Sequence, residues 1–144
     1  MSLLPAAPGR PHTDAVFAAL ETIGLLVGRG EEPAGAGWQG EPGASDFVPY
    51  AVLYPTPGVP DGDLADPNEY IDYSCQATCV AASQEGAEAV ADIVKTLVGT
   101  RPTVVGRQSY PVYLILDRPA SRDDSVAPVV HYAIVQLRFR TGPA

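Results

Sequence analysis

The stretch Tyr70–Gly99, YIDYSCQATCVAASQEGAEAVADIVKTLVG, contains two hydrophobic periods in succession. Apolar residues first alternate with polar ones from Ile71 to Cys79, which is the two-residue period of a half-buried strand. After Ser83 the apolar residues recur every three or four positions, the period of an amphipathic helix; they are Ala87, Val90, Ala91, Val94, Leu97 and Val98. The stretch therefore predicts a strand that leads directly into a helix, the core of an α/β layer.

Four further elements are expected outside this stretch. Thr13 is a good N-cap, and apolar residues at helical spacing predict a helix from Thr13 to Val27 that Gly28 ends. Alternating or β-prone residues predict three more strands, at Phe47–Tyr54, Tyr110–Leu116 and Val129–Arg140. The resulting fold class is α+β: a two-layer sandwich of a mixed, mainly antiparallel sheet packed against two helices, with residues 1–144 as a single domain.

The last predicted strand has two different faces. One face is apolar throughout and is expected to join the core; it consists of Val129, His131, Ala133, Val135, Leu137 and Phe139. The other face changes from Val130, Tyr132 and Ile134 to Gln136, Arg138 and Arg140. We therefore expect Arg138 and Arg140 to lie on a surface open to solvent or to a partner.

Three segments rich in glycine, proline or charge are predicted to be loops. The first, 29–46, contains Trp38, for which a partner contact and packing onto the core are equally plausible. The second, 55–68, contains Asp61, Asp63 and Asp66, but it lacks the other ligands of a calcium loop. The third, 117–128, is expected to be a polar hairpin connection and contains Arg118, Arg122, Asp123 and Asp124.

The sequence contains no recognisable catalytic or metal-binding pattern. It has no phosphate-binding loop and no nucleophile elbow. On a strand, Cys75 and Cys79 would lie roughly 13 Å apart, too far for a disulfide, so packing residues are expected there. His131 falls on the core face, and His12, placed before the first helix, has no partner that the sequence can name. We therefore expect a protein that is not an enzyme and has no cofactor and no metal.

Charge and hydropathy limit the partners. The net charge of −8, with Lys95 as the only lysine, argues against binding to a nucleic-acid backbone, which needs clustered cations. No apolar run is long enough to span a membrane, and residues 1–10 lack the pattern of a signal peptide. We expect a chain that is made and used inside a cell.

The arrangement of elements resembles the tail terminator (tail completion) proteins of long-tailed bacteriophages. The resemblance rests on the helical start, on the strand Ile71–Cys79 leading into the "Ala-Glu-Ala" helix of 83–94, and on a polar Asp/Arg/Pro loop before a closing strand of the form aromatic-x-x-x-x-x-Arg-x-Arg, His131–Arg140. It covers most of the chain. The loops at 29–46 and 55–68 are longer than the pattern requires.

This resemblance implies a virion protein, assembled in the host cytoplasm and located in the tail or neck. Such proteins form a hexameric ring that caps the tail tube, ends tail polymerisation and joins the tail to the head connector, with DNA passing through the lumen. The implied partners are other copies of the chain, the major tail tube protein and the head-tail connector or stopper protein. An acidic bore would suit the passage of DNA because it repels phosphates.

The candidate contact residues are those of the three loops and of the closing strand: Trp38, Asp61, Asp63, Asp66, Arg118, Arg122, Asp123, Asp124, Arg138 and Arg140. Two alternatives stay open, namely another head-tail neck or joining protein and a monomeric ligand-binding α+β module.

Overall fold

The computed structural model describes residues 9–56, 59–60 and 69–144, and within these it contains two helices and nine strands. The helices are α1 (Gly9–Ile23) and α2 (Gln84–Lys95). The strands are β1 (Leu26–Arg29), β2 (Gly37–Trp38), β3 (Phe47–Val48), β4 (Tyr50–Pro55), β5 (Val59–Pro60), β6 (Ile71–Ala81), β7 (Arg107–Ser109), β8 (Tyr113–Asp123) and β9 (Val130–Pro143).

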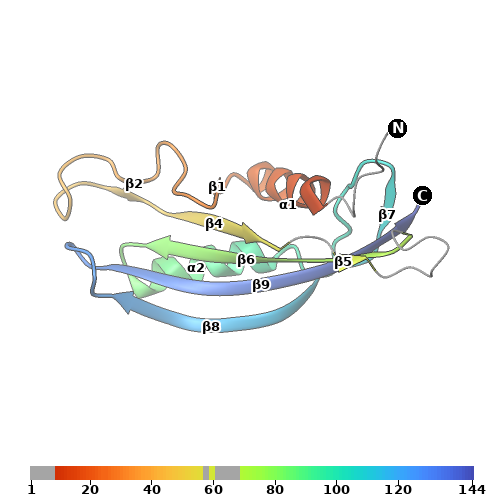
Figure 1. Ribbon diagram of the computed structural model, residues 1–144. Helices are drawn as coiled ribbons and strands as arrows, with labels where there is room; N and C mark the ends of the chain where they lie inside the picture. Colours follow the sequence, from red (N-terminus) through yellow and green to blue (C-terminus); the bar gives the residue numbers. More distant parts are fainter. Residues whose placement is uncertain (1–8, 57–58, 61–68) are drawn as a thin grey trace.

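Seven of these strands form one sheet in the order β1-β4-β6-β9-β7, with β5 paired to β6 and β8 paired to β9. Only the β1–β4 pair is parallel, and the other pairs of the sheet are antiparallel. The longest ladder joins β6 to β9, from Ile71 opposite Thr141 to Ala81 opposite His131. Figure 1 shows these two strands running through the middle of the elongated molecule, with α2 behind them. The predicted class, a mixed and mainly antiparallel sheet packed against two helices, is confirmed.

The core lies between the helices and one face of the sheet. Every second residue of β6, from Tyr73 to Ala81, is buried there, as are Ala133, Val135, Leu137 and Phe139 of β9. Leu20 of α1 and Val94 of α2 close this layer from the other side. The alternation expected from Ile71 onward is thus confirmed, and Cys75 and Cys79 are buried free thiols in this layer.

Helix α2 begins where the sequence predicts. Ser83 is its N-cap, in an extended conformation, and its hydroxyl accepts a hydrogen bond from the Gly86 amide at 3.0 Å. Glu85 in the first turn and Lys95 in the last turn complement the helix dipole. The change of period read from the sequence is therefore a real boundary between strand and helix.

Helix α1 differs from its predicted bounds at both ends. It starts at Gly9, so His12 and Thr13 lie inside it and are buried. It ends at Ile23 because Gly24, with φ of +95°, takes the left-handed conformation that closes a helix. Val27, expected in the helix, instead pairs with Ala51 of β4. The apolar residues have helical spacing, but pairing with β4 makes this segment a strand instead.

The segment 29–46 is also more ordered than the predicted loop. Arg29 ends β1, and Gly37 and Trp38 form β2, which pairs with Val48 and Phe47 of β3 in a separate two-stranded sheet. The expected strand at Phe47–Tyr54 is divided in two at Pro49, after which β4 begins.

The predicted hairpin connection at 117–128 is wrong over its first half. β8 continues through Asp117 to Asp123, paired with β9, and it starts at Tyr113 rather than at Tyr110. Register shifts between Arg118 and Ser121 let the strand pass Pro119, which cannot donate to a ladder. The polar residues of this segment do not by themselves indicate a strand, but pairing with the long strand β9 keeps the segment in the sheet. The short strand β7 is not predicted by the sequence, and neither is β5, which pairs with β6 inside the predicted loop 55–68.

Candidate assembly surface

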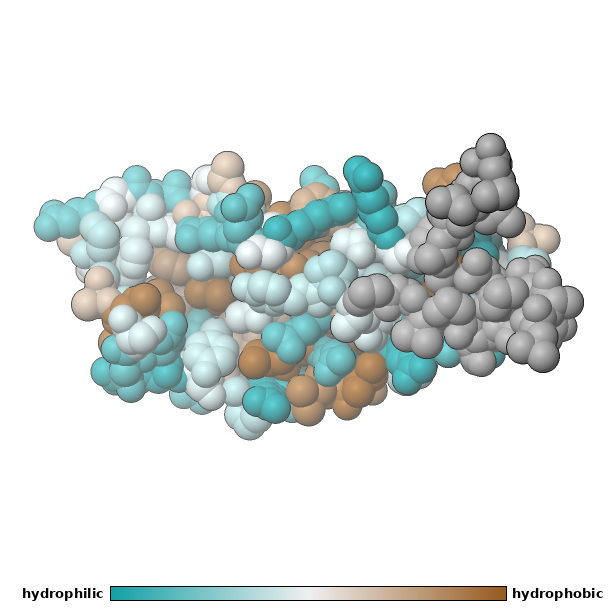
Figure 2. Space-filling model, in the orientation of Figure 1, coloured by the Kyte–Doolittle hydropathy of each residue, from teal (hydrophilic) through white to brown (hydrophobic). Residues whose placement is uncertain are grey.

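The second face of the sheet is not covered by a helix in the described part of the chain. Along β6 this face consists of Asp72, Ser74, Gln76 and Thr78, all half-buried, and along β9 of the half-buried residues Tyr132, Ile134, Gln136, Arg138 and Arg140. We call it the open face. Figure 2 shows its mixture of polar and hydrophobic side chains. Arg138 and Arg140 therefore lie where the sequence places them.

Asp72 links these two arginines. Arg140 donates to both of its carboxylate oxygens, from Nε at 3.0 Å and from a terminal guanidinium nitrogen at 3.2 Å, which is a two-point contact. Arg138 approaches the same carboxylate at 3.6 Å. The Arg140 guanidinium also lies 5.4 Å from the centre of the Tyr70 ring. The Asp72 side chain is only 16% exposed, so this cluster is fixed rather than freely solvated.

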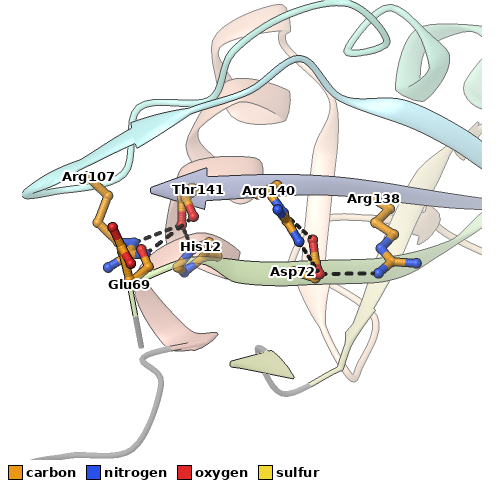
Figure 3. Close-up of polar contacts among 7 residues, drawn as sticks. All are labelled: His12, Glu69, Asp72, Arg107, Arg138, Arg140 and Thr141. Carbon is orange, nitrogen blue, oxygen red and sulfur yellow. Dashed lines mark hydrogen bonds and ion pairs between the residues drawn. The ribbon is translucent and has the colours of Figure 1, made fainter. Parts of the chain in front are cut away.

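A buried polar cluster lies beside it, at the end of β9. The Thr141 hydroxyl is 2.6 Å from Nε2 of His12, and it accepts a hydrogen bond from Nε of Arg107 at 2.8 Å. Arg107 also donates to the Glu69 carbonyl at 2.6 Å. Figure 3 shows these contacts joining α1, β7, β9 and the chain before β6. His12 thus has structural partners, which come from segments distant in sequence.

The His12 ring packs in an aromatic group within the core. It stacks on Tyr73 with ring centres 5.5 Å apart and lies 5.7 Å from Phe139. The Tyr73 hydroxyl is 2.6 Å from that of Thr13, and burial raises the pKa of Tyr73 above its ordinary value. This arrangement binds α1 to the sheet and leaves His12 no access to solvent.

The candidate residues of the third loop lie on and beyond an edge strand. β8 is bonded to β9 on one side only, and most of its residues are exposed. Arg118 is exposed and makes no ion pair within the described residues. Arg122 instead contacts Asp124 at 2.7 Å, and both side chains are well solvated.

Two further carboxylates of β8 are engaged locally. Asp123 accepts hydrogen bonds from the amide and the hydroxyl of Ser125, which lower its pKa and close the turn to β9. Asp117, on the side of the sheet that faces the helices, accepts a hydrogen bond from Lys95 of α2 at 2.9 Å. These contacts give Asp123 a role in the turn.

Trp38 is half-buried and sits in the small β2–β3 sheet. Its ring packs edge-on against Phe47, with centres 5.1 Å apart, and Phe47 in turn stacks on Tyr50. The glycine-rich segment also approaches the β8–β9 turn, because a Cβ at Gly43 would lie 3.1 Å from Pro128. Trp38 thus packs within the small β2–β3 sheet and is still partly accessible, and its role in a partner contact stays a prediction.

The candidates therefore fall into separate groups. Arg138 and Arg140 share the open face with Arg118, whereas Trp38 and the Arg122–Asp124 pair lie toward the opposite end of the molecule, where Figure 1 shows β2 and the β8–β9 turn. Asp61, Asp63 and Asp66 lie outside the described residues. Asp72 and the exposed start of β8 are not among the candidates that the sequence suggests. Alternation marks the polar face of β6, but only the strand register brings Asp72 to the arginines.

No catalytic or metal-binding arrangement is found in the described part of the chain. It contains no group of three or more His, Cys, Asp or Glu side chains that could hold a metal ion. Burial raises the pKa of both cysteine thiols to about 12, so neither is a ready nucleophile. His131 is half-buried at the end of the core face, and its Nδ1 has no hydrogen-bond partner among the described residues. Neither described helix is long and apolar enough to cross a membrane.

Comparison with known proteins gives a structural likeness only. No family model matches the sequence, and no curated protein matches it either. Among solved structures, a chain from the virion of a native gene transfer agent particle superposes with a TM-score of 0.58, at 21% sequence identity, over 91% of this chain and 87% of that one. A second solved chain, 15% identical over 92% of this chain and 96% of its own, has a TM-score of 0.46 and is too distant to inform the argument. The fold of this chain is thus one that also occurs in a virion particle.

Proposed function

We propose that this chain is a structural subunit of a phage-like virion, and specifically a tail terminator. In this role six copies form a ring that caps the tail tube, ends its polymerisation and joins the tail to the head connector, with DNA passing through the lumen. The observation that carries the proposal is the likeness to a chain of the gene transfer agent virion, because it extends over nearly the whole of both chains. The resemblance of the sequence to tail terminators supplies the finer assignment.

The surface of the molecule supports assembly better than catalysis. A sheet with one face that no described helix covers, and with a long exposed edge strand, presents much surface that a partner could cover. A ligand-binding module needs a concave pocket with convergent polar groups. The hollow beside Lys95 is instead a surface groove in which Lys95 is paired with Asp92 and Asp117, and Glu88 and Arg118 line it as well.

The neck or joining protein remains the second candidate, since the same fold likeness would suit it. The two roles differ in partner: a terminator binds the end of the tail tube, whereas a joining protein binds the portal side. The single domain over 1–144, the localisation in the tail or neck and the non-enzymatic role are parts of this proposal.

The test measures assembly and capping separately. Native mass spectrometry and negative-stain microscopy of the purified chain, alone and mixed with polymerising tail tube protein, should show closed rings, and rings at the ends of tubes of limited length. A chain that stays monomeric at all concentrations, and that neither binds tubes nor limits their growth, would exclude the terminator role. Rings that bind a portal complex and ignore tubes would favour the joining protein.

A further inference from the structure

The two edges of the main sheet carry different surfaces at matching positions along the strands. One edge is β8, and the other is formed by β1 and by the end of β4 that extends past it. We propose that β8 of one copy docks against the β1–β4 edge of a second copy, so that the ring closes through one head-to-tail contact repeated around the axis. This inference rests on the ring proposed above and names the surfaces that would form it.

β8 exposes a short apolar run at its start. Tyr113, Leu114 and Ile115 are 49%, 38% and 45% exposed, and the strand that carries them is paired only with β9 among the described residues. Figure 2 shows hydrophobic surface along the lower edge of the molecule, where Figure 1 places β8. A long edge strand with exposed apolar residues and unpaired backbone groups is a template for pairing with another chain.

The register shows what lies level with this run on the other edge. Leu114 of β8 pairs with Leu137 of β9, which pairs with Cys75 of β6, which in turn pairs with Pro55 of β4. Leu116 is likewise level with Tyr54 of β4, by pairing through Gln136 and Gln76, and Tyr54 is 46% exposed. β1 ends opposite Leu53, so Tyr54 and Pro55 continue past it. An apolar surface on one edge is therefore level with an apolar surface on the other.

Charges match at the next position along the strands. Arg118 is level with Gly28 of β1, through Ile134, Thr78 and Val52. A Cβ at Gly28 would meet the carbonyl of Glu31 at 1.8 Å, so the backbone of Glu31 lies over β1 on the open face, the same face as Arg118. Both Arg118 and Glu31 are exposed, and neither makes an ion pair within the described residues. Two unpaired groups of opposite charge would meet in the proposed contact.

Self-pairing of β8 fits less well. A two-fold contact between two β8 strands would run antiparallel and would place the apolar start of each strand against the charged end of the other, which contains Arg122 and Asp123. It would also produce a closed dimer rather than a ring. The head-to-tail contact instead sets the apolar start of β8 level with Tyr54 and Pro55, and Arg118 level with Gly28, over which the backbone of Glu31 lies.

The first experiment is a charge exchange. Arg118→Glu and Glu31→Arg should each raise the protein concentration at which half of the chains are assembled by about tenfold or more, and the double exchange should restore assembly. Arg101→Glu, an exposed residue away from both edges, is the matched control and should assemble as the wild type does. Native mass spectrometry gives the assembled fraction, and thermal unfolding of each variant confirms that it folds.

The second experiment tests the apolar half of the contact. Ile115→Asp should prevent assembly, whereas Val105→Asp, at an apolar residue that is 88% exposed in a loop, should not. The double variant Ile115→Cys, Tyr54→Cys should form disulfides between neighbouring copies, which gives a series of covalent oligomers on oxidation. A mixture of the two single variants should give only covalent dimers that contain one copy of each. The native thiols will not interfere, since both are buried.

The outcomes separate this contact from the ring itself. If Ile115→Asp and Arg118→Glu still form rings as the wild type does, the edge contact is overturned and the ring stands. Covalent oligomers from open filaments would keep the edge contact and overturn the ring. Exclusive dimers cross-linked through Ile115 alone, or a wild type that never assembles with or without tail tubes, would overturn the contact.

Discussion

At the scale of single residues, the structure gives Asp72 a role that neighbouring residues in sequence do not suggest. It is the carboxylate that compensates both Arg138 and Arg140, and it is largely shielded from water. Removing this carboxylate is costly because its charge-assisted hydrogen bonds to Arg140 are lost. Pairs in full solvent carry no such cost.

This contrast predicts the effect of neutralising one carboxylate. Asp72→Asn should lower the free energy of unfolding by about 1–3 kcal/mol, because charge-assisted hydrogen bonds to Arg140 are lost. Asp124→Asn removes the solvated partner of Arg122 and should change stability by less than about 0.5 kcal/mol. Urea unfolding at neutral pH measures both, and equal effects of the two substitutions would contradict the assignment.

The buried thiols predict a loss of stability in alkali. Burial raises the pKa of Cys75 and Cys79 to about 12 from an ordinary value of 9.0, so above pH 9 the unfolded chain releases protons that the folded chain retains. Stability is then fully present below pH 9 and falls as the pH rises toward 12. At pH 10 the loss should be about 1.4 kcal/mol for each thiol.

Denaturant unfolding at pH 8 and pH 10 checks this expectation. The double variant Cys75→Ala, Cys79→Ala should start less stable, because it leaves small cavities, but it should lose less between the two pH values. Tyr73, whose pKa is also raised by burial, acts in the same direction above pH 10 and is unchanged in the variant. An identical pH dependence in both proteins would show that the thiols do not titrate as proposed.

At the scale of secondary structure, the end of α1 shows how a partner decides between helix and strand. Apolar residues continue at helical spacing to Val27, yet the helix ends before Gly24 and the chain joins β4 as β1. Gly24 supplies the left-handed turn, and Gly28 allows Glu31 to lie close above the strand. The two glycines are needed for different reasons.

Substitution by asparagine separates these two reasons. Gly24→Ala should cost about 1–2 kcal/mol from its positive φ, and Gly24→Asn less, because asparagine tolerates this conformation. At Gly28 the order reverses: any side chain meets the Glu31 carbonyl, so Asn should be at least as damaging as Ala. Thermal unfolding of the four variants is the measurement. A helix that ended at Gly28 would instead make Gly28→Asn the milder change.

At the scale of the whole molecule, the described charges are divided between the two layers. The open face sets Asp72 against two arginines, whereas the exposed side of α2 carries Glu85, Glu88 and Asp92. With a net charge of −8 the chain should repel polyanions over most of its surface. This property suits the proposed passage of DNA through a ring without adhesion.

Reversal of the α2 charges tests this property. The wild-type chain should not retain duplex DNA at 50 mM salt. A variant with Glu85→Lys, Glu88→Lys and Asp92→Lys adds three cations beside Lys95 and should retain it, with binding that weakens sharply by 200 mM salt. Filter binding at both salt concentrations is the measurement, and wild-type binding at 50 mM would contradict a role in which DNA only passes through.

The sequence by itself determined the strand–helix boundary at Ser83, the class of the fold and the packing role of the two cysteines, because hydrophobic period and capping are local properties of the chain. It also placed Arg138 and Arg140 on the face of the sheet that no described helix covers. Tertiary structure alone decided that residues 26–29 form a strand, that 117–123 belong to β8 and that His12 is buried against Thr141. In each of these cases the deciding partner lies far along the chain, and the energy of strand pairing or of a buried hydrogen bond depends on that partner and not on the local residues. The match between the two sheet edges is likewise visible only once the register of four ladders is known.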